Sequence, residues 1–229
     1  VPIPIPPPTP IPPVVDSSVA YSKIVQNGVT CHIHTLDATK VIPFVTPTVF
    51  LTVLDAAAKY KQKLVINADQ WDVSNPVCPT GRAMSNDVWY STSANEASIF
   101  FGAQAGQVAI QWNRISPPFF WKPIQIVSFP KMLISGGKIA KKFDDTLKAA
   151  WQTFSISQDK KTYTIVTSDG IENQNGLTIK GVADLLASLG VWQSVLFDSG
   201  GSTQVFSPFV DYASDQPARR TVNKLCFTW

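Results

Sequence analysis

The stretch that most limits how this chain can fold is Val195–Phe206, with the sequence VLFDSGGSTQVF. Its first three residues are apolar and predict a short buried strand, which ends where Asp198 and the polar residues after it begin. Gly200 and Gly201 permit backbone conformations closed to other residues and let a ligand come close to the main chain. Successive backbone N–H groups in such a turn can bind an anion. The stretch therefore predicts a binding site at a strand end, with a plain strand–loop–strand connection as the alternative.

The composition is that of a globular protein. A chain of 229 residues is long enough for one large domain or two small ones. Its net charge of +3 is too small to indicate nucleic acid as a partner. No apolar run approaches the ~18 residues that a membrane-spanning helix needs, and no signal peptide is visible. The cysteines Cys31, Cys78 and Cys226 are expected to be buried free thiols, with one disulfide and one free thiol as the alternative.

The chain begins with VPIPIPPPTPIPPVV, in which eight of fifteen residues are proline. This composition predicts a stiff polyproline II linker over residues 1–16, followed by one folded domain over residues 17–229. Such linkers join domains, so we expect an upstream domain in the full-length protein. The alternative is a Pro-rich arm that packs on this domain or on a neighbouring subunit.

Apolar periodicity predicts an α+β domain, with a mixed or antiparallel sheet core and a few helices. One helix is expected over Thr46–Lys61, and a second is expected to begin at Thr178 and stop at Gly190. We expect Pro76–Arg82 to be a loop. Ser116–Pro130 is expected to be an irregular connection, with a stacking surface for a sugar ring as the alternative. Strands are expected at Ala20–Leu36 (a pair turning at Asn27-Gly28), Leu64–Ile66, Val88–Tyr90, Ser98–Phe101, Val108–Trp112, Met132–Ile139 (a hairpin), Trp151–Ile156, Thr162–Thr167, Val195–Phe197 and Val222–Phe227.

Several of these strands end in polar clusters. If the clusters meet, one cleft contains carboxylates, backbone N–H groups and a guanidinium. This mixture suits a sugar-phosphate, because arginine binds phosphate oxygens and carboxylates bind sugar hydroxyls and transfer protons. The clusters lie at residues 67–72, 169–170, 198–203 and 219–220.

His32 and His34 are the only histidines in the chain and lie on one face of a predicted strand. Either imidazole can act as an acid or base near neutral pH. Together with Asp37 they can alternatively bind a metal, which would make the protein a metal-dependent hydrolase. Our main prediction includes neither a metal nor a cofactor.

The order of these elements resembles the phosphodiester glycosidase family. Residues 176–202 are similar to its signature block: a Gly-Leu-Thr helix start, a Leu-Gly helix end, and a strand that runs into an Asp-Gly-Gly-Gly-Ser turn. The resemblance covers residues 28–229. Further elements that match in order are Ile66–Trp71, Gly81, Leu133–Ile139, Asp169-Gly170 and Arg220–Asn223.

Three departures from the family pattern stand out. Ser199 replaces the first glycine of the triplet, and Ala68-Asp69 replaces Gly-Gly. The family's arginine is absent from Ala150–Phe154. If that arginine holds the phosphate, the chain lacks one phosphate contact, which implies a different substrate or lost activity.

The resemblance implies a hydrolase that cleaves a sugar-1-phosphodiester or related glycosidic bond. The expected substrate is a surface glycan of a cell wall, capsule or exopolysaccharide, and the expected location is extracellular, on the cell surface or on a virion, as in a divergent phage member. The alternative is a non-catalytic glycan-binding or virion structural module on the same fold.

The residues and the resemblance together predict the site. The expected catalytic residues are Asp198, Asp169 and His34. Arg220 is expected to hold the phosphate, with Arg219 in its place as the alternative. The full set expected to bind substrate is Asn67, Asp69, Gly81, Gly200, Gly201, Ser202, Thr203 and Arg220.

Overall fold

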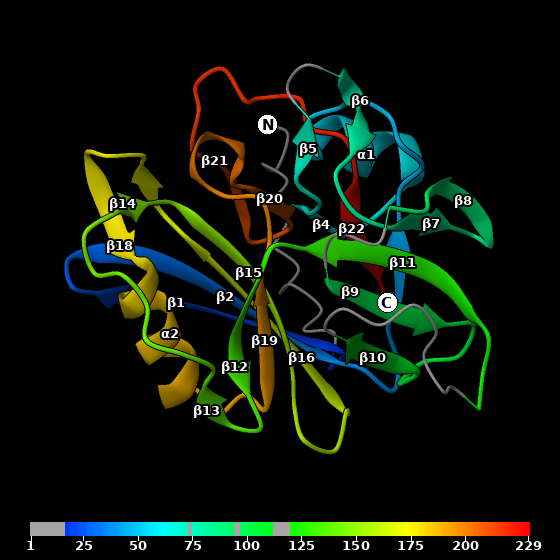
Figure 1. Cartoon of the computed structure of the whole chain (residues 1–229), viewed down its shortest axis with the longest axis horizontal. Coiled ribbons are helices and arrows are strands. Elements are labelled where there is room, and N and C mark those ends of the chain that lie inside the picture. The colour runs from blue at the N-terminus through cyan, green and yellow to red at the C-terminus, as the bar shows by residue number, and fades with distance from the viewer. Residues whose placement is uncertain (1–16, 73–74, 94–96, 112–119) are drawn as a thin grey trace, which may run out of the picture.

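The computed structural model describes residues 17–72, 75–93, 97–111 and 120–229. Within these residues the strands form five sheets, and every strand pairing is antiparallel. Two α-helices accompany the sheets (Figure 1). The expected antiparallel sheet core with a few helices therefore agrees with the structure in outline. The linker predicted over residues 1–16 lies outside the described residues and stays a prediction.

The largest sheet has seven strands and contains most of those read from the sequence. Its β1–β2 hairpin turns at Asn27 and Gly28, both with positive φ, as the Asn-Gly pair predicts. In spatial order the strands are β1 (Val19–Gln26), β2 (Val29–Asp37), β16 (Thr162–Ser168), β15 (Trp151–Ile156), β19 (Gln193–Leu196), β12 (Lys131–Ser135) and β13 (Lys138–Ile139).

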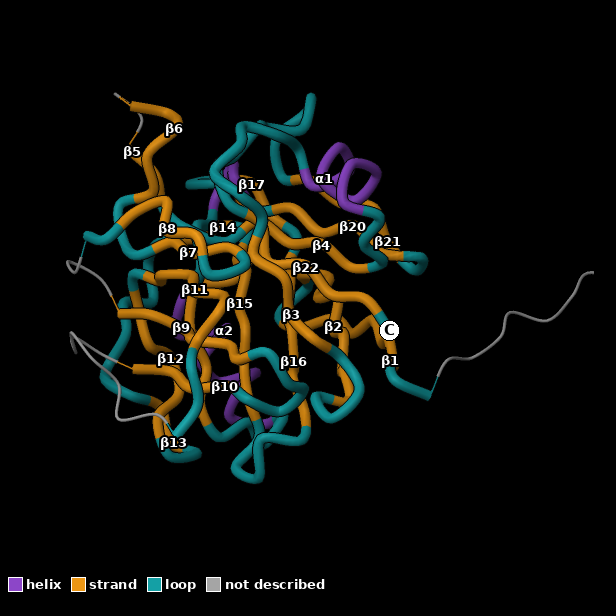
Figure 2. The backbone as a smooth tube through the Cα atoms, turned by 90° about the vertical axis from the view of Figure 1, so that its right-hand side faces the viewer, coloured by secondary structure: helices purple, strands orange, loops and turns teal. Residues whose placement is uncertain are grey.

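Two five-stranded sheets pack beside it (Figure 2). The sheet centred on β4 contains β21 (Val210–Ala213), β20 (Gln204–Ser207), β4 (Leu64–Asn67), β22 (Lys224–Thr228) and β3 (Ile42–Val45). The other contains β10 (Val108–Gln111), β9 (Ala97–Gly102), β11 (Pro123–Phe129), β7 (Ala83–Ser85) and β8 (Val88–Ser91). The small sheets contain β14 (Lys148–Ala149), β18 (Asn175–Thr178) and β17 (Gly170–Ile171), and β5 (Trp71–Asp72) with β6 (Asn75–Pro79).

One apolar core joins the three large sheets. Phe154 and Tyr163 from the seven-stranded sheet contact Phe101 of β9 and Phe227 of β22 through their rings. Buried aromatic side chains of this size contribute much of a core's apolar area, and their tilted or edge-on contacts add to it. The opposite face of the seven-stranded sheet packs on α2 in a second cluster, and α1 packs on the β4 sheet in a third.

The two helices begin where capping residues occur in the sequence. α2 (Ile179–Ser188) starts after Thr178, whose hydroxyl accepts from Gly181 N, and Gly190 follows it with φ of 69°. This confirms the second predicted helix. The first helix is shorter than predicted: α1 (Val53–Tyr60) begins only after Thr52, which caps it.

The prediction that the first helix begins at Thr46 was therefore wrong. The residues before Thr52 are not helical: Thr46 N donates to Lys224 O of β22, and Leu51 forms an isolated bridge with Thr221. Neither helix among the described residues is long and apolar enough to cross a membrane.

Two segments expected to be irregular contain strands. β6 overlaps the first residues of the loop predicted at Pro76–Arg82, and β11 lies within the connection predicted at Ser116–Pro130. β11 is a strand because its Ile126 and Val127 are buried between neighbouring layers while its backbone pairs with both β9 and β7. Residues 112–119 of that connection lie outside the described residues.

The cysteines agree with the expected free thiols where they are described. Cys31 and Cys226 are both buried, and neither forms a disulfide. Burial raises the pKa of the Cys31 thiol to about 12, so this group stays protonated and unreactive near neutral pH. The Cys78 side chain lies outside the described part of the structure.

Candidate active site

A cavity of about 360 Å³ lies at the end of β19, where the DSGGST stretch leaves the seven-stranded sheet. Half-buried Asp198 lies on its wall, and the next residues form a short 3-10 turn, η1 (Gly200–Ser202). The strand end predicted from the sequence therefore borders a cavity. The complete lining is Gln70, Pro130, Lys131, Leu147, Ala149, Trp151, Glu172, Leu196, Phe197, Asp198, Ser199, Gly200, Gly201, Ser202 and Arg219.

Asn67 holds this loop at both of its ends. It is the last residue of β4 and is fully buried. Its Nδ2 donates to the backbone O of Asp198 at 2.5 Å, and its Oδ1 accepts from Gln204 N at 2.8 Å. The Asp198 N–H also donates to Ala68 O at 2.9 Å. Asn67 was predicted to bind substrate, but in the structure both of its polar side-chain atoms contact the main chain. Its geometry is that of a positioning residue.

Replacing Asn67 by alanine is expected to lower kcat of any activity at this cavity by about tenfold or more, because the Asp198 loop loses two buried hydrogen bonds worth roughly 1 kcal/mol each. The matched control is Asn223→Ala. Asn223 is also buried, but its side chain bonds Thr46 O instead of the loop. Thermal unfolding should report similar destabilisation of both variants, and only Asn67→Ala should lose turnover beyond that. Equal kcat in the two variants would contradict the positioning role.

The two glycines of the turn place charged side chains directly against the backbone. Gly200 has φ of 64°, and a Cβ atom added there would lie 2.8 Å from Glu172 Oε2. A Cβ atom on Gly201 would lie 2.5 Å from Asp215 Oδ1 and 2.7 Å from Arg219 Nη2. The positive φ favours glycine at position 200, and at both positions a side chain would displace the ends of these charged side chains.

The anion site expected at this turn is smaller than predicted. The Gly200 N–H donates to Ala150 O at 2.9 Å, and the Thr203 N–H donates to Gly200 O at 3.0 Å. The Ser202 N–H is directed to Ser199 O within the 3-10 turn, so the Gly201 N–H is the remaining candidate for binding an anion. The Thr203 hydroxyl is buried and donates to Ala150 O at 3.1 Å, so this side chain supports the turn and does not line the cavity.

Arg219, and not Arg220, contributes a guanidinium to the cavity wall. Its Nη2 and Nε lie 2.6 Å and 2.9 Å from Asp215 Oδ2. Both arginines are exposed, and Arg220 is not among the lining residues. Asp215, four residues before Arg219, holds the guanidinium over the glycine turn by its Nε and Nη2 atoms, which leaves the Nη1 side to face a phosphate group.

Glu172, Trp151 and Lys131 are among the cavity residues that the sequence analysis did not assign to the site. Glu172 lies in the turn between β17 and β18, so only the fold of this hairpin brings its carboxylate to Gly200. The sequence did predict a polar strand end at Asp169-Gly170. Nothing in that pattern indicated that Glu172, two residues later, would also reach a cavity. Trp151 is mostly buried and donates from Nε1 to Leu177 O at 2.6 Å, which fixes the ring in the cavity wall.

Asp69 and Gly81 do not line this cavity. Asp69 is buried, and its Oδ1 accepts from the Ser128 N–H at 2.6 Å and from the Ser128 hydroxyl at 2.5 Å. Gly81 is buried in the connection before β7. Asp69, one of the two residues that replace Gly-Gly of the family pattern, therefore ties the end of β4 to β11.

Asp169 and the histidines form a separate network. The carboxylate of Asp169 lies 3.0 Å from His32 Nε2, and His32 Nδ1 lies 2.8 Å from the Tyr21 hydroxyl. His34 is fully buried, with Nε2 2.9 Å from Ser207 Oγ. Burial lowers the pKa of His34 to about 4, with His32 as the second cause, so His34 is neutral near pH 7. Neither Asp169 nor His34 lines the cavity at Asp198.

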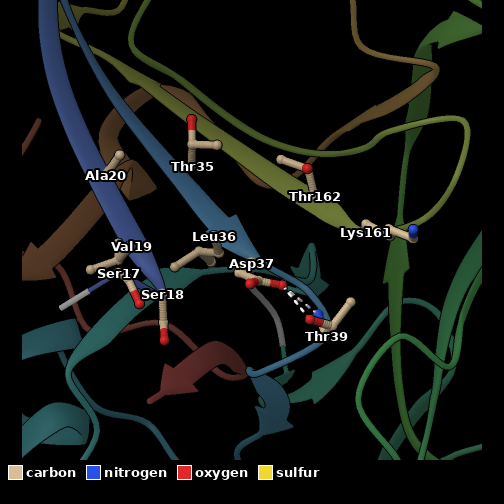
Figure 3. A pocket seen from close by; sticks show the side chains of 10 residues that line it. All are labelled: Ser17, Ser18, Val19, Ala20, Thr35, Leu36, Asp37, Thr39, Lys161 and Thr162. Atoms are coloured by element: carbon tan, nitrogen blue, oxygen red, sulfur yellow. Dashed lines mark hydrogen bonds between the residues drawn. The ribbon is translucent and has the colours of Figure 1, made fainter.

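The metal alternative required Asp37 to join the two histidines. Asp37 lies instead in a larger cavity of about 580 Å³ between the ends of β1, β2 and β16 (Figure 3). There its Oδ1 accepts from the Thr39 N–H at 3.0 Å, and the Thr39 hydrogen bonds lower the pKa of the carboxyl. Within the described ranges no three His, Cys, Asp or Glu residues form a group that could hold a metal ion. His32 and His34 therefore lie apart from Asp37, and the three side chains do not form the proposed metal site.

The sequence model of the family described as NAGPA, phosphodiester glycosidase, matches residues 60–228. The chain belongs to the phosphodiester glycosidase family. Every residue that lines the cavity at Asp198 falls within the matched range. The resemblance inferred from the ordered motifs is therefore confirmed.

Solved structures agree with this membership at the level of fold. The zebrafish N-acetylglucosamine-1-phosphodiester alpha-N-acetylglucosaminidase catalytic domain, auto-inhibited by its pro-peptide, is similar with a TM-score of 0.75 and 16% identity, over 95% of this chain and 84% of that one. A hypothetical protein from Synechocystis is similar with a TM-score of 0.71 and 12% identity, over 91% of this chain and 61% of that one. No curated protein sequence gives a significant match.

Proposed function

We propose that this protein is a hydrolase that cleaves a sugar-1-phosphodiester, or a related glycosidic bond, in a surface glycan. Membership of the phosphodiester glycosidase family supports the reaction class. The observation that carries the proposal is that Asp198, Glu172 and Arg219 line one cavity. Two carboxylates and a guanidinium are the groups that cleavage of an anionic glycosidic bond requires.

Each of these groups has a part in the proposed reaction. Arg219 binds a phosphate oxygen through the Nη1 side of its guanidinium, the side not bonded to Asp215, and stabilises the charge that builds up on the departing phosphate. Lys131, which also lines the cavity, adds a second positive charge. Asp198 and Glu172 face the sugar carbon, where one carboxylate assists water or attacks the carbon and the other exchanges a proton with the leaving oxygen.

The substrate and setting are parts of the same proposal. The zebrafish relative is named for an N-acetylglucosamine-1-phosphodiester, which makes that group the first substrate to test. We place the glycan in a cell wall, capsule or exopolysaccharide, and the protein outside the cell, on its surface or on a virion. The proposal involves no nucleic acid, and no cofactor takes part in it.

The test compares two neighbouring arginines on a methyl phosphodiester of N-acetylglucosamine. We expect native protein to release reducing sugar, and Arg219→Ala to lower kcat/KM by about tenfold or more, because a hydrogen bond to a charged group is worth roughly 1.5–3 kcal/mol. Arg220→Ala is the matched control, and its rate should stay near the native value, since Arg220 is exposed and lies outside the cavity lining.

Two outcomes would count against the hydrolase. Equal loss in both arginine variants would remove the phosphate-binding role of Arg219. Absence of turnover on a panel of glycosyl phosphodiesters, together with retained binding to the same glycans, would favour the non-catalytic glycan-binding or virion structural module.

A further inference from the structure

A second, smaller cavity of about 230 Å³ lies where β2 begins and β16 ends, and its lining shares no residue with that of the first. Its volume is below the ~300 Å³ at which pockets for drug-sized ligands begin, so it suits one small molecule. It opens beside Gly28, where nothing lies within 4 Å of an added Cβ atom. The lining is Gly28, Val29, Thr30, Asp169, Gly170, Asn175 and Gly176.

The carboxylate in this cavity is held from behind by buried groups. The Asp169 side chain is 37% exposed, while the side chain of its partner His32 is only 8% exposed. His32 Nδ1 lies 2.8 Å from the Tyr21 hydroxyl, and the Tyr21 ring stacks on Phe209 with 3° between the planes. The Asp169 N–H also donates to Thr30 O at 2.8 Å. The carboxylate is therefore oriented before any ligand arrives, which lowers the entropy lost on binding.

The same hairpin borders both cavities. Strands β17 and β18 and their turn contribute Glu172 to the first cavity and Asp169 and Asn175 to the second. Behind the hairpin, Cβ atoms on Gly170 and Gly176 would lie 2.8 Å and 2.3 Å from the Ala149 backbone, and Ala149 lines the first cavity. The β17–β18 hairpin thus lies between the two cavities.

The polar groups of the second cavity fit a neutral ligand. Its single carboxylate already contacts the His32 imidazole through Oδ1, and no lysine or arginine lies among the lining residues, so the cavity does not favour an anion. Asn175 Oδ1 accepts from Ile171 N at 2.8 Å, which leaves its Nδ2 group as a donor. A carboxylate acceptor, an amide donor and the Thr30 hydroxyl together match a ring with several hydroxyl groups.

We propose that the cavity around Asp169 is a binding subsite for a neutral sugar residue, next to the cavity at Asp198. This inference rests on the proposed function, because a glycan long enough to cross the β17–β18 hairpin would occupy both cavities. Asp169 accepts hydrogen bonds from sugar hydroxyls, and His32 acts as the positioning residue that orients the carboxylate. Asp169 is in this proposal a binding residue and not the catalytic residue expected from the sequence.

The experiment measures binding without turnover. Native full-length chain is titrated with free N-acetylglucosamine, glucose, mannose and galactose, which carry no bond to cleave, while backbone amide shifts are followed by NMR. We expect at least one sugar to shift the amides of residues 28–30, 170 and 175–176 in a saturable way. Asp169→Asn should weaken that binding by about tenfold, as expected for a hydrogen bond to a charged group.

Matched variants keep the result interpretable. Asp144→Asn removes another exposed carboxylate, one that accepts from Thr146 in a different loop, and should leave the titration unchanged. Asn175→Ala, at the exposed start of β18, supplies a second variant should Asp169→Asn fold poorly, and it should also weaken binding. For His32→Asn we expect a raised Kd with sugar shifts that stay at the same amides.

The outcomes separate this inference from the function. If none of the four sugars shifts these amides, or if Asp169→Asn and Asn175→Ala bind as tightly as native protein, the subsite is overturned, whatever the turnover on phosphodiesters. Saturable binding here, with no turnover of any glycosyl phosphodiester, overturns the hydrolase and leaves the subsite standing.

Discussion

Replacing Asp198 by asparagine is expected to reduce kcat on a sugar-1-phosphodiester by at least about 100-fold, the lower end of what a positioned acid or base contributes. The carboxylate lies on the cavity wall, directly before the glycine turn. Asparagine has nearly the same shape but can neither attack a sugar carbon nor take up a proton at neutral pH. The loop should keep its conformation, because Asn67 and Ala68 hold it through the backbone atoms of residue 198.

Steady-state release of reducing sugar, with thermal unfolding as a check of folding, measures this effect. Asp211→Asn is the matched control, since Asp211 is an exposed carboxylate on β21 and does not line the cavity at Asp198. If Glu172 is the second catalytic carboxylate, the kcat of Glu172→Gln is expected to lie between the values for Asp198→Asn and Asp211→Asn. Native-like turnover by Asp198→Asn would remove the residue on which the proposed chemistry depends.

The second large effect concerns Lys224, whose side chain is fully buried in β22. Its Nζ donates to the backbone O of Thr221 at 2.6 Å and of Val222 at 3.4 Å. Burial lowers the pKa of Lys224 to about 7, and this outweighs the opposite influence of Cys226 and Asp55. Replacing Lys224 by methionine should therefore raise the free energy of unfolding near neutral pH, by about 1–3 kcal/mol after the lost hydrogen bonds are deducted.

The sign of the pH dependence follows from the lowered pKa. Between the folded value of about 7 and the ordinary value of 10.5, the unfolded chain binds more protons at Lys224 than the folded chain does. The free energy of unfolding should therefore rise with pH across this window through Lys224, by at most ~5 kcal/mol. Below the folded pKa the penalty for burying the charge is fully present.

Urea unfolding of native protein and Lys224→Met, near pH 7 and near pH 10, measures this difference. The advantage of the methionine variant should be largest near neutral pH and shrink as the pH rises, because neutral lysine is far less costly to bury. Tyrosines and cysteines also titrate in alkali, but their contributions are common to both proteins. Parallel stability curves would mean that Lys224 keeps an ordinary pKa in the folded state.

The sequence alone determined the local elements and the family. The Asn27-Gly28 hairpin, the α2 cap at Thr178 and the strand that ends at Asp198 are encoded by residues close to one another in the chain. Turn chemistry, capping and apolar alternation act over a few residues, so they can be read without knowing the fold. The ordered motifs of the phosphodiester glycosidase family are local in the same sense.

Only the tertiary structure decided which strand ends share a cavity. Glu172 reaches Gly200 through the β17–β18 hairpin, and Arg219 lines the cavity while its neighbour Arg220 does not. Asp169 pairs with His32 at a different cavity, although it too follows a predicted strand. The physical reason is that β19, β16 and β4 are brought together by pairings and packing between residues far apart in the chain, and no local pattern specifies that order.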